Sequence, residues 1–571
     1  MILDDWRYRA YHVVTLAGIP LLQLAVYPSL FVTPGGNQSI DPWVYVGFSL
    51  SLPAHLQRFG ETYYASRLSW IVPGFIAHRL FPPLVAEYVL HLAFFYALLA
   101  ATYMLVARAV NRSAAMLAAL LVAWEPAILG AMSWDYVDGA GIAFLVVTLL
   151  CLEGAAGPRR TVAWSVAAGV AGACAIVTNL VLLGLMPACI VFLWLRAGPK
   201  RRNVIVRTVA AATAGAVATL ILFAIVNKSL GGPWLFLAGS IRIVTGFYGH
   251  ASSWRVPFLV FDWARHSWLV LPSIAGLGAL ASLAAPPTGQ SSFARAVQVT
   301  ALVAIGTWLV SDLVMRSNFL QYGYYVSYLV PFAVLALLLQ APALQPTGRL
   351  SAIVALELVT LAVLEISHMV LTSNGGALWR DLVFYARPRP LLDEKFVLMS
   401  VATAAGLVAA LALRLLRPFR LAWGAFIVAM ACTYVAAWRY VPIEMDRRGD
   451  FLDTVSAHRF IAKNVGEREV RFWSCHPSLY SPPFQSISST YLWGYVLLND
   501  QFPALTEAQA AVLRSDTRLV LLLNPHDETD DARNALRHFG YDISVVAQEE
   551  FGMPQRPFRV VVADLVRRPA A

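Results

Sequence analysis

The chain has 571 residues, of which 58% are hydrophobic and only 13% are charged, and its mean hydropathy is +0.63. An ordinary soluble domain carries roughly 25% charged residues, so this composition excludes a disordered chain and an ordinary water-soluble enzyme. Five cysteines exclude a disulfide scaffold, and a net charge of +10 spread over short connections does not indicate nucleic acid. The composition is typical of a membrane protein with many spans.

An α-helix that crosses about 30 Å of hydrocarbon needs roughly 20 apolar residues. On this criterion the sequence predicts a polytopic all-α membrane domain over residues 1–441, with about thirteen transmembrane helices. The run 162–195 is too long for one span, and Thr178-Asn179 at its midpoint predicts two short helices. The predicted spans are 11–32, 83–107, 114–131, 139–153, 162–177, 180–195, 204–226, 266–285, 296–315, 323–341, 351–372, 396–416 and 419–441.

The connections between these spans differ in length and charge. Short ones such as 108–112 and 196–202 are rich in arginine, whereas 33–82, 227–265 and 373–395 are long and hold most of the loop acids. The positive-inside rule therefore predicts a multi-pass inner-membrane protein with a cytoplasmic N-terminus. We expect the first apolar run to be an anchored span, because no small-residue cleavage site follows it.

Residues 442–571 are mixed polar and charged and contain no run of span length. With an odd number of spans, this segment is predicted to be an extracytoplasmic (periplasmic) α/β domain. An amphipathic stretch at 451–464 predicts a helix, and helical patterns recur at 506–514 and 529–539. Short strands are predicted at Val470–Cys475, Leu519–Leu523, Ile543–Val546 and Phe558–Val562.

Three acids stand at the external ends of early spans. Asp41 opens the first external loop, 33–82, and Asp135 and Asp138 lie in the short second external turn. Neighbouring carboxylates raise one another's proton affinity unless a cation or substrate group lies between them, which suits a general base or a metal site. The structural alternative is that Asp41 caps a helix with Pro42 at its first position, and that the other two acids form a solvated turn.

The first external loop is too long for a simple connection, and it combines aromatic residues with arginines. We expect interfacial helices at 43–59 and 62–81, because Trp and Tyr favour the headgroup level and Arg there can pair with phosphate. For any single residue, the alternative is an ordinary aromatic belt.

This layout resembles the GT-C superfamily of membrane glycosyltransferases, and most of all the bacterial branch of the lipid A aminoarabinose transferase and the protein O-mannosyltransferases. Pro42 stands where relatives often have a second acid, so the resemblance does not decide whether a divalent metal binds at this position. The matching positions are Asp41 with Tyr45, then Tyr63, Tyr64, Arg67 and Pro73, then Asp135 or Asp138, and finally the segment from Arg316 through Tyr325 to Pro331.

The resemblance implies transfer of a sugar from a polyprenyl phosphate to a lipid, glycan or protein acceptor at the external face. An inverting displacement needs a base but no protein nucleophile; Asp41 is the first choice, followed by Asp138 and Asp135. The leaving phosphate needs forked guanidinium donors. The candidate donor-binding residues are Arg58, Tyr63, Tyr64, Arg67, Arg255, Arg316 and Tyr325.

Two other functions are compatible with the sequence. A transporter or flippase of a lipid-linked glycan would depend on Asp312, Glu357 and Glu365, which lie within apolar runs. A non-catalytic assembly or sensor protein would tolerate Asn in place of Asp41 and Asp138.

Two further polar residues lie within predicted spans. Glu125 either lines the donor cavity or satisfies the helix that Pro126 interrupts. His91 is expected to be a hydrogen-bonded core histidine.

Overall fold

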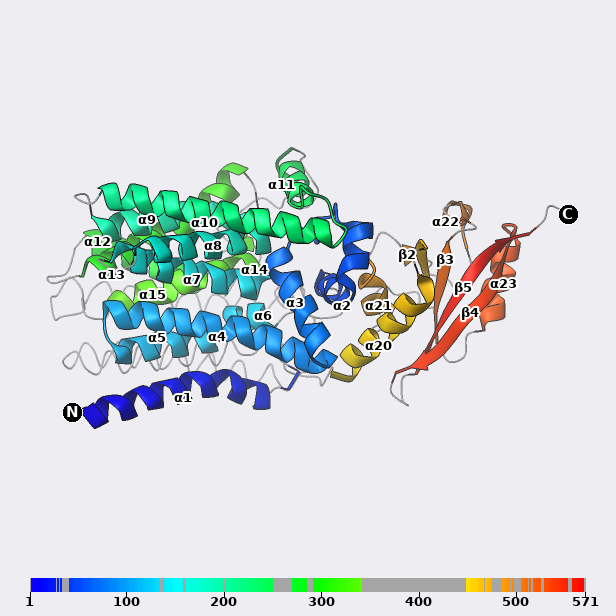
Figure 1. Ribbon diagram of the computed structural model, residues 1–571, viewed down its shortest axis with the longest axis horizontal. Coiled ribbons are helices and arrows are strands. Elements are labelled where there is room, and N and C mark those ends of the chain that lie inside the picture. Colours follow the sequence, from blue (N-terminus) through cyan, green and yellow to red (C-terminus); the bar gives the residue numbers. More distant parts are fainter. Residues whose placement is uncertain are drawn as a thin grey trace, which may run out of the picture.

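A computed structural model shows an elongated molecule in which a bundle of long helices is joined at one end to a small sheet-containing unit (Figure 1). Helices α2 and α3 lie between the two (Figure 1). The described residues are 2–26, 28–29, 31–32, 41–133, 137–157, 161–198, 202–249, 270–284, 291–315, 317, 319–321, 323–340, 448–466, 468–474, 484–492, 496–497, 505–511, 513–514, 517–524, 528–552 and 557–568.

The described part of the membrane domain is built almost entirely from helices. Its elements are α1 (Ile2–Val26), α2 (Asp41–Phe59), α3 (Leu68–Leu80), α4 (Pro83–Ala109), α5 (Arg112–Trp124), α6 (Pro126–Ser133), α7 (Asp138–Ala156), α8 (Thr161–Thr178), η1 (Leu180–Leu185), α9 (Met186–Ala197), α10 (Arg202–Ser229), α11 (Ala238–Gly249), α12 (Val270–Ala284), α13 (Ser292–Val310), η5 (Ser311–Met315), η6 (Phe319–Gln321), α14 (Gly323–Val326), η7 (Ser327–Leu329) and α15 (Val330–Gln340).

Within the described residues, five helices are long and apolar enough to cross a membrane, and the bent pair α5–α6 makes a sixth. The prediction of a helical protein with several spans is therefore confirmed. The count of about thirteen stays a prediction, because the spans expected at 351–372, 396–416 and 419–441 lie outside the described residues.

Two helix breaks, after α5 and after α8, have local chemical causes. Glu125 follows α5, and its carboxylate accepts the Ile128 N–H at 2.8 Å, so it caps α6 across a 62° bend. Capping is thus the role that the structure gives to Glu125. The run 162–195 forms two helices, because Asn179 ends α8 and accepts the Val181 N–H at 3.3 Å.

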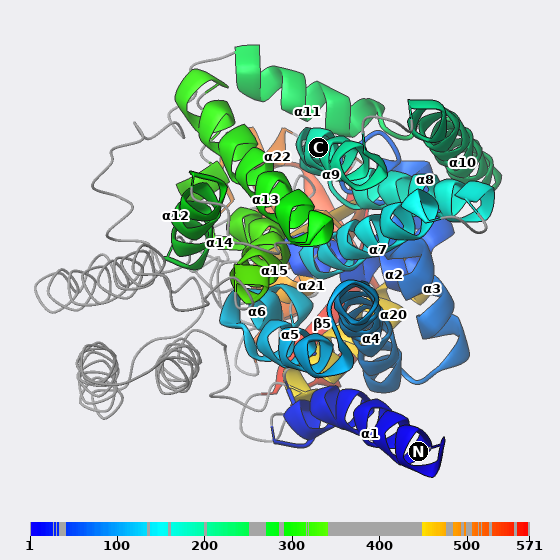
Figure 2. The same cartoon turned by 90° about the vertical axis from the view of Figure 1, so that its left-hand side faces the viewer.

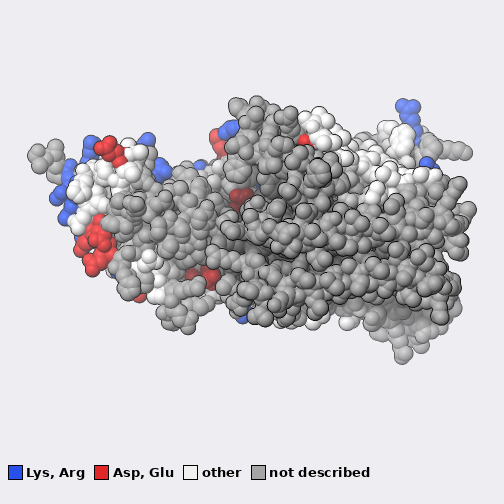
Figure 3. All heavy atoms as spheres, turned by 180° about the vertical axis from the view of Figure 1, so that it is seen from behind, with Lys and Arg blue, Asp and Glu red and all other residues white. Residues whose placement is uncertain are grey.

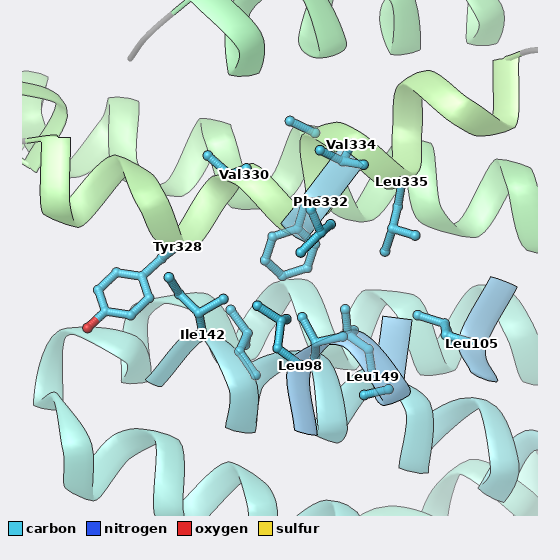
Figure 4. Close-up of a cluster of buried hydrophobic side chains, with 14 of the residues drawn as sticks. Leu98, Leu105, Ile142, Leu149, Tyr328, Val330, Phe332, Val334 and Leu335 are labelled. Atoms are coloured by element: carbon cyan, nitrogen blue, oxygen red, sulfur yellow. The ribbon is translucent and has the colours of Figure 1, made fainter. Parts of the chain in front are cut away.

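Helix α7 forms the interior of the bundle, where it contacts α4, α8 and α9 (Figure 2). Fifteen of its 19 residues are buried, whereas only four of the 28 residues of α10 are. The core between α4, α7 and α15 is apolar and contains Leu98, Ile142 and Phe332 (Figure 4). The exposed apolar face of α10 is the surface that a lipid chain would cover.

The segment 33–82 contains two helices, as the sequence predicts, although α3 begins later than expected because residues 60–67 form turns. Helix α2 is kinked at Ser51, whose φ of −138° and ψ of 46° are not helical. Pro53 follows, and its missing N–H and its ring explain why the regular hydrogen bonding breaks there.

The C-terminal unit is a five-stranded sheet in the order β2-β1-β3-β5-β4, with β1 parallel to β2 and β3, and β5 antiparallel to β3 and β4. Most of the charged side chains visible in Figure 3 gather over this unit. Its elements are α20 (Arg448–Val465), β1 (Val470–Ser474), α21 (Phe484–Ser489), β2 (Val496–Leu497), α22 (Glu507–Ala510), β3 (Arg518–Leu523), α23 (Thr529–Arg537), β4 (Tyr541–Phe551) and β5 (Phe558–Arg567).

All four predicted strands are present, while β2 and α21 are additions and α22 is shorter than the predicted helix 506–514. Alternate residues of β3 enter two apolar clusters, since Leu521 packs on the α23 side with Leu536 and Val520 on the α20 side with Ile461. The sheet is thereby covered by helices on both faces.

Candidate active site

Asp41 lies in the first turn of α2, and two tyrosines from the turn before α3 contact its carboxylate. Tyr64 donates its hydroxyl hydrogen to Oδ1 at 2.6 Å, and Tyr63 donates to Oδ2 at 3.3 Å. The two phenol rings lie against each other with centroids 3.9 Å apart. The side chain of Asp41 is therefore held in one orientation, and both tyrosine hydroxyls face the carboxylate.

Arg67 is buried between aromatic rings, with only 8% of its surface exposed. Its guanidinium carbon lies 5.4 Å from the centroid of Tyr45 and 5.1 Å from that of Tyr63. Cation–π contacts of this kind hold a guanidinium in place while leaving its N–H donors available for other partners. Arg67 directly precedes α3, so the turn between α2 and α3 fixes its position.

Asp138 begins α7 and is completely buried. The Tyr328 hydroxyl donates to its Oδ1, and Asn179 donates through Nδ2 to the Tyr328 oxygen at 3.2 Å. Among the described residues, Oδ2 has no hydrogen-bond partner. Gly141 allows the tyrosine to approach, because a Cβ there would lie 2.9 Å from Tyr328 Cε1.

These groups act on one another electrostatically. Burial raises the pKa of the Tyr45 phenol well above its usual value, the Arg67 charge opposes that rise, and both Asp41 and Asp138 add to it. Arg67 also interacts with Asp138. Tyr63 links Asp41 to Arg67, because its hydroxyl donates to the carboxylate and its ring contacts the guanidinium, while the Asp138 charge acts on Tyr45 from a separate segment of the chain.

Tyr63 and Tyr64 remain protonated donors. Burial raises the pKa of both phenols well above the usual value, and the negative charge of Asp41 raises it further. A carboxylate that accepts two such donors is oriented for proton transfer to or from a third group placed beside it.

The remaining predicted donor-binding residues are distributed as follows. Arg58 lies at the other end of α2 and donates to the Gly466 carbonyl oxygen at 2.5 Å, so the structure does not bring it to Asp41. Tyr325 packs against Trp308, with centroids 6.1 Å apart, next to Tyr328. Asp135, Arg255 and Arg316 lie outside the described residues.

Tyr328 and Asn179 are site residues that sequence reasoning missed. The sequence indicates Asn179 only as a helix break, and Tyr328 is one of several aromatic residues after α13. Nothing in local spacing distinguishes Tyr328 from Tyr325, because its role depends on the placement of α7.

Two acids near the bundle have local roles. Asp312 accepts the backbone N–H groups of Phe319 and Leu320 at 2.6 and 2.7 Å. Glu87 accepts a hydrogen bond from His78 at 2.6 Å, and its carbonyl accepts from His91 at 2.9 Å, which confirms His91 as a hydrogen-bonded core histidine.

In the described parts of the chain, no three His, Cys, Asp or Glu side chains are grouped so that they could hold a metal ion. Asp41 and Asp138 each supply one carboxylate.

No protein-family model matches the chain, and no curated protein matches it in sequence. Among solved structures it is similar to ArnT from Cupriavidus metallidurans in the apo state, at 16% identity, a TM-score of 0.48 and coverage of 98% of both chains. ArnT bound to undecaprenyl phosphate aligns at 15% identity and a TM-score of 0.49, over 96% of this chain and 97% of that one.

A third similar structure is the archaeal oligosaccharyltransferase AglB from Archaeoglobus fulgidus, in complex with an inhibitory peptide and a dolichol-phosphate. It aligns at 12% identity and a TM-score of 0.42, over 88% of this chain and 61% of that one.

Proposed function

We propose that this protein is an integral-membrane glycosyltransferase that moves a sugar from a polyprenyl-phosphate donor to an acceptor hydroxyl at the extracytoplasmic face. The observation that carries this proposal is the position of Tyr63, whose hydroxyl donates to Asp41 and whose ring contacts the Arg67 guanidinium. A half-buried carboxylate and a guanidinium held between aromatic rings supply a proton acceptor and a phosphate-binding group on either side of one tyrosine.

The reaction is a single inverting displacement. The acceptor oxygen forms a bond to the anomeric carbon while its proton passes to Asp41. The bond between the anomeric carbon and the phosphate oxygen breaks, and the polyprenyl phosphate leaves with the electron pair. Asp41 is the base because its carboxylate is half-buried and reachable, whereas Asp138 is completely buried. Asp138 is the second candidate, since its Oδ2 has no partner within the described residues.

Arg67 is the group that would hold the leaving phosphate. Its forked donors match phosphate oxygens, and the rings of Tyr45 and Tyr63 hold it in place before the donor arrives. Donors fixed in advance stabilise the charge that develops on the phosphate without reorganising during the reaction.

The position of the site suits a lipid-linked donor. Helices α2 and α3 lie at the end of the bundle that faces the C-terminal unit (Figure 1). The proposal places this end outside the cytoplasm, with a cytoplasmic N-terminus, about thirteen spans, and residues 442–571 as an external domain. A polyprenyl phosphate could then reach the site from within the membrane, and the acceptor is a lipid, a glycan or a protein.

The test is to incubate the purified protein in nanodiscs with a panel of undecaprenyl-phosphate-linked sugars and candidate acceptors, and to measure the release of undecaprenyl phosphate. We expect transfer with at least one pair, and loss of transfer in Asp41→Asn at unchanged membrane level and folding. Asp530→Asn, an exposed acid of α23, is the matched control and should stay active. An active Asp41→Asn variant would remove Asp41 as the base.

The transporter alternative has less support from the described residues. Its predicted residue Asp312 is occupied by two backbone N–H groups at a helix end, while Glu357 and Glu365 lie outside the described part of the chain. The assembly-protein alternative is tested by the same Asp41→Asn and Asp138→Asn variants, because it predicts that both tolerate the change.

A further inference from the structure

The kink in α2 divides this helix into two arms. The first arm carries Asp41 and Tyr45, and the second carries His55 and Arg58. Ser51 has non-helical dihedral angles, and Pro53 cannot supply a backbone hydrogen bond across the break. The relative orientation of the two arms must therefore be set by groups outside the helix.

The C-terminal unit supplies such a group at the kink itself. His458 of α20 contacts the Ser51 hydroxyl through Nε2 at 3.0 Å and the Thr490 hydroxyl through Nδ1 at 2.9 Å. The Thr490 hydroxyl donates to the Ile487 carbonyl at 2.7 Å, so it accepts from His458 Nδ1–H. His458 is then the neutral tautomer that accepts the Ser51 hydrogen at Nε2.

A second histidine joins the same contact from α2. His55 lies with Nε2 at 2.6 Å from the Thr490 carbonyl oxygen and Nδ1 at 3.2 Å from the Ser51 carbonyl oxygen. The two imidazole centroids are 5.8 Å apart, and His458 stacks on Tyr491 at 4.7 Å. Both histidines are buried, with 2% and 0% of their surface exposed.

The first arm of α2 is fitted to the C-terminal unit as well. A Cβ at Gly47 would lie 2.0 Å from the Thr490 carbonyl oxygen, so only glycine allows this approach. Four residues earlier, Trp43 stacks on Phe451 of α20, with ring centroids 6.3 Å apart. The contact therefore runs along α2 from the kink towards Asp41.

We propose that His458 is a positioning residue: by binding the kink of α2 it sets the orientation of the arm that carries Asp41, and protonation of the His55–His458 pair releases this arm. The proposal rests on the proposed role of Asp41 for its effect on transfer. The contact between α2 and the C-terminal unit can be measured independently of any activity.

The surroundings of the pair disfavour a positive charge. The charged or titratable groups that act on it are Arg58 on α2, Arg459 on α20 and His78 on α3, and His78 in turn binds Glu87 of α4. Tyr491 adjoins both rings and remains a neutral phenol, because burial raises its pKa well above the usual value.

Among the described residues, neither His55 nor His458 has a carboxylate partner. Burial lowers the pKa of His55 to about 4 despite its two carbonyl contacts, and lowers that of His458 well below its usual value.

The experiment is hydrogen–deuterium exchange on the full chain in nanodiscs, between pH 7.5 and 4.5, corrected for the intrinsic pH dependence of exchange. His458→Ala at pH 7.5 should exchange about ten-fold faster in residues 41–59, because the kink loses a buried hydrogen bond. Ser51→Ala removes the same hydrogen bond with less disturbance to the C-terminal unit, and it should also increase exchange in residues 41–59. It replaces His458→Ala in the experiment if that variant fails to fold.

The double variant His55→Gln, His458→Gln separates the effect of protonation from the effect of losing the hydrogen bonds. A glutamine amide can donate to both carbonyls that His55 contacts, or donate to Thr490 and accept from Ser51 at position 458, and it does not titrate. We expect wild-type protection at pH 7.5 and no acid-induced loss of protection in residues 41–59. The control His538→Gln, at an exposed site after α23, should behave like the wild type.

Transfer kinetics with an undecaprenyl-phosphate-linked sugar supply the second measurement. His458→Ala should lower kcat about ten-fold with KM changed less than about two-fold, because Asp41 is displaced with its arm, whereas Arg67 precedes α3 and keeps its contact with Tyr63. The proposal is overturned if α2 exchange is the same in His458→Ala, Ser51→Ala and wild type, or if the double glutamine variant loses protection in acid as the wild type does. If no donor is turned over by the wild type, the proposed function fails while the exchange data still decide the contact.

Discussion

Replacing Tyr328 by phenylalanine removes one oxygen from the centre of the candidate site. That oxygen donates to Asp138 Oδ1 and accepts from Asn179. The ring would keep its packing against Trp308, 5.9 Å away, and against Gly141. The perturbation is therefore confined to hydrogen bonding, without a cavity large enough to repack the helices.

The magnitude follows from the burial of the three partners. Tyr328 and Asp138 are completely buried and Asn179 is 5% exposed, so water cannot replace the lost contact. A hydrogen bond to a charged group contributes about 1.5–3 kcal/mol, and a buried carboxylate oxygen left without a donor adds its desolvation penalty. Because Asp138 Oδ2 already has no partner among the described residues, we expect Tyr328→Phe to lower the free energy of unfolding by about 2–3 kcal/mol.

The assay is a double-mutant cycle with Asp138→Asn, using unfolding titrations in mixed micelles. An amide oxygen needs the tyrosine donor less than a carboxylate does, so the loss should fall to about 1 kcal/mol when Tyr328→Phe is introduced into the Asp138→Asn variant. Tyr96→Phe is the comparison, because its hydroxyl bonds the Ala17 carbonyl at 2.7 Å at an exposed position. The role given to this buried network is refuted if Tyr328→Phe is no more destabilising than Tyr96→Phe. It is also refuted if the free-energy losses of Tyr328→Phe and Asp138→Asn simply add in the double variant, because the two side chains would then not be coupled.

The other predictions concern the base, the guanidinium, the fit to the C-terminal unit and the pH dependence. Asp41→Asn should lower the transfer rate about 10²–10⁴-fold at unchanged thermal stability, since an amide cannot take the acceptor proton. Arg67→Lys should lower kcat/KM for the donor about ten-fold or more, because an ammonium cannot make two parallel bonds to phosphate. Gly47→Ala should lower the unfolding midpoint and increase proteolysis at 448–466, because its Cβ would clash with the Thr490 carbonyl. Burial lowers the pKa of His55 from its usual 6.5 to about 4, so the contribution of the neutral imidazole to stability is complete above pH 6.5 and is lost as the pH falls to 4. That loss amounts to about 3 kcal/mol, and His55→Gln should abolish it in unfolding titrations at pH 7.5 and 4.5.

Each of these has a contrary outcome. Transfer by Asp41→Asn within about three-fold of wild type would exclude a base at this position. A kcat/KM for the donor unaffected by Arg67→Lys would mean that other groups bind the phosphate. Wild-type stability of Gly47→Ala would mean that α2 and the C-terminal unit are not in close contact. Equal acid sensitivity of wild type and His55→Gln would assign the pH dependence to other groups.

Features that depend on neighbours along the chain were predictable from the sequence. The apolar run at 83–107 corresponds to α4, Pro83–Ala109, and the strand predicted at Val470–Cys475 corresponds to β1, Val470–Ser474. The predicted break at Asn179 is also confirmed. These elements follow from burial periodicity and from capping or proline chemistry, which act over a few residues.

Strand ends depended on partners elsewhere in the sheet. β4 and β5 extend beyond the runs predicted at 543–546 and 558–562, because they pair with each other from Tyr541↔Arg567 to Phe551↔Phe558. That pairing supplies backbone hydrogen bonds to polar residues whose side chains give no apolar signal.

The sequence by itself indicated a membrane domain with several spans, a polar C-terminal α/β segment, and the acids and arginines of segment 33–82 as candidates. Only the tertiary structure decided which of these residues lie together. Asp41 and Arg67 both contact Tyr63, whereas Arg58 contacts the C-terminal unit at Gly466. Such pairings depend on how each helix is rotated and packed against others far away in the chain, and local periodicity carries no information about that choice.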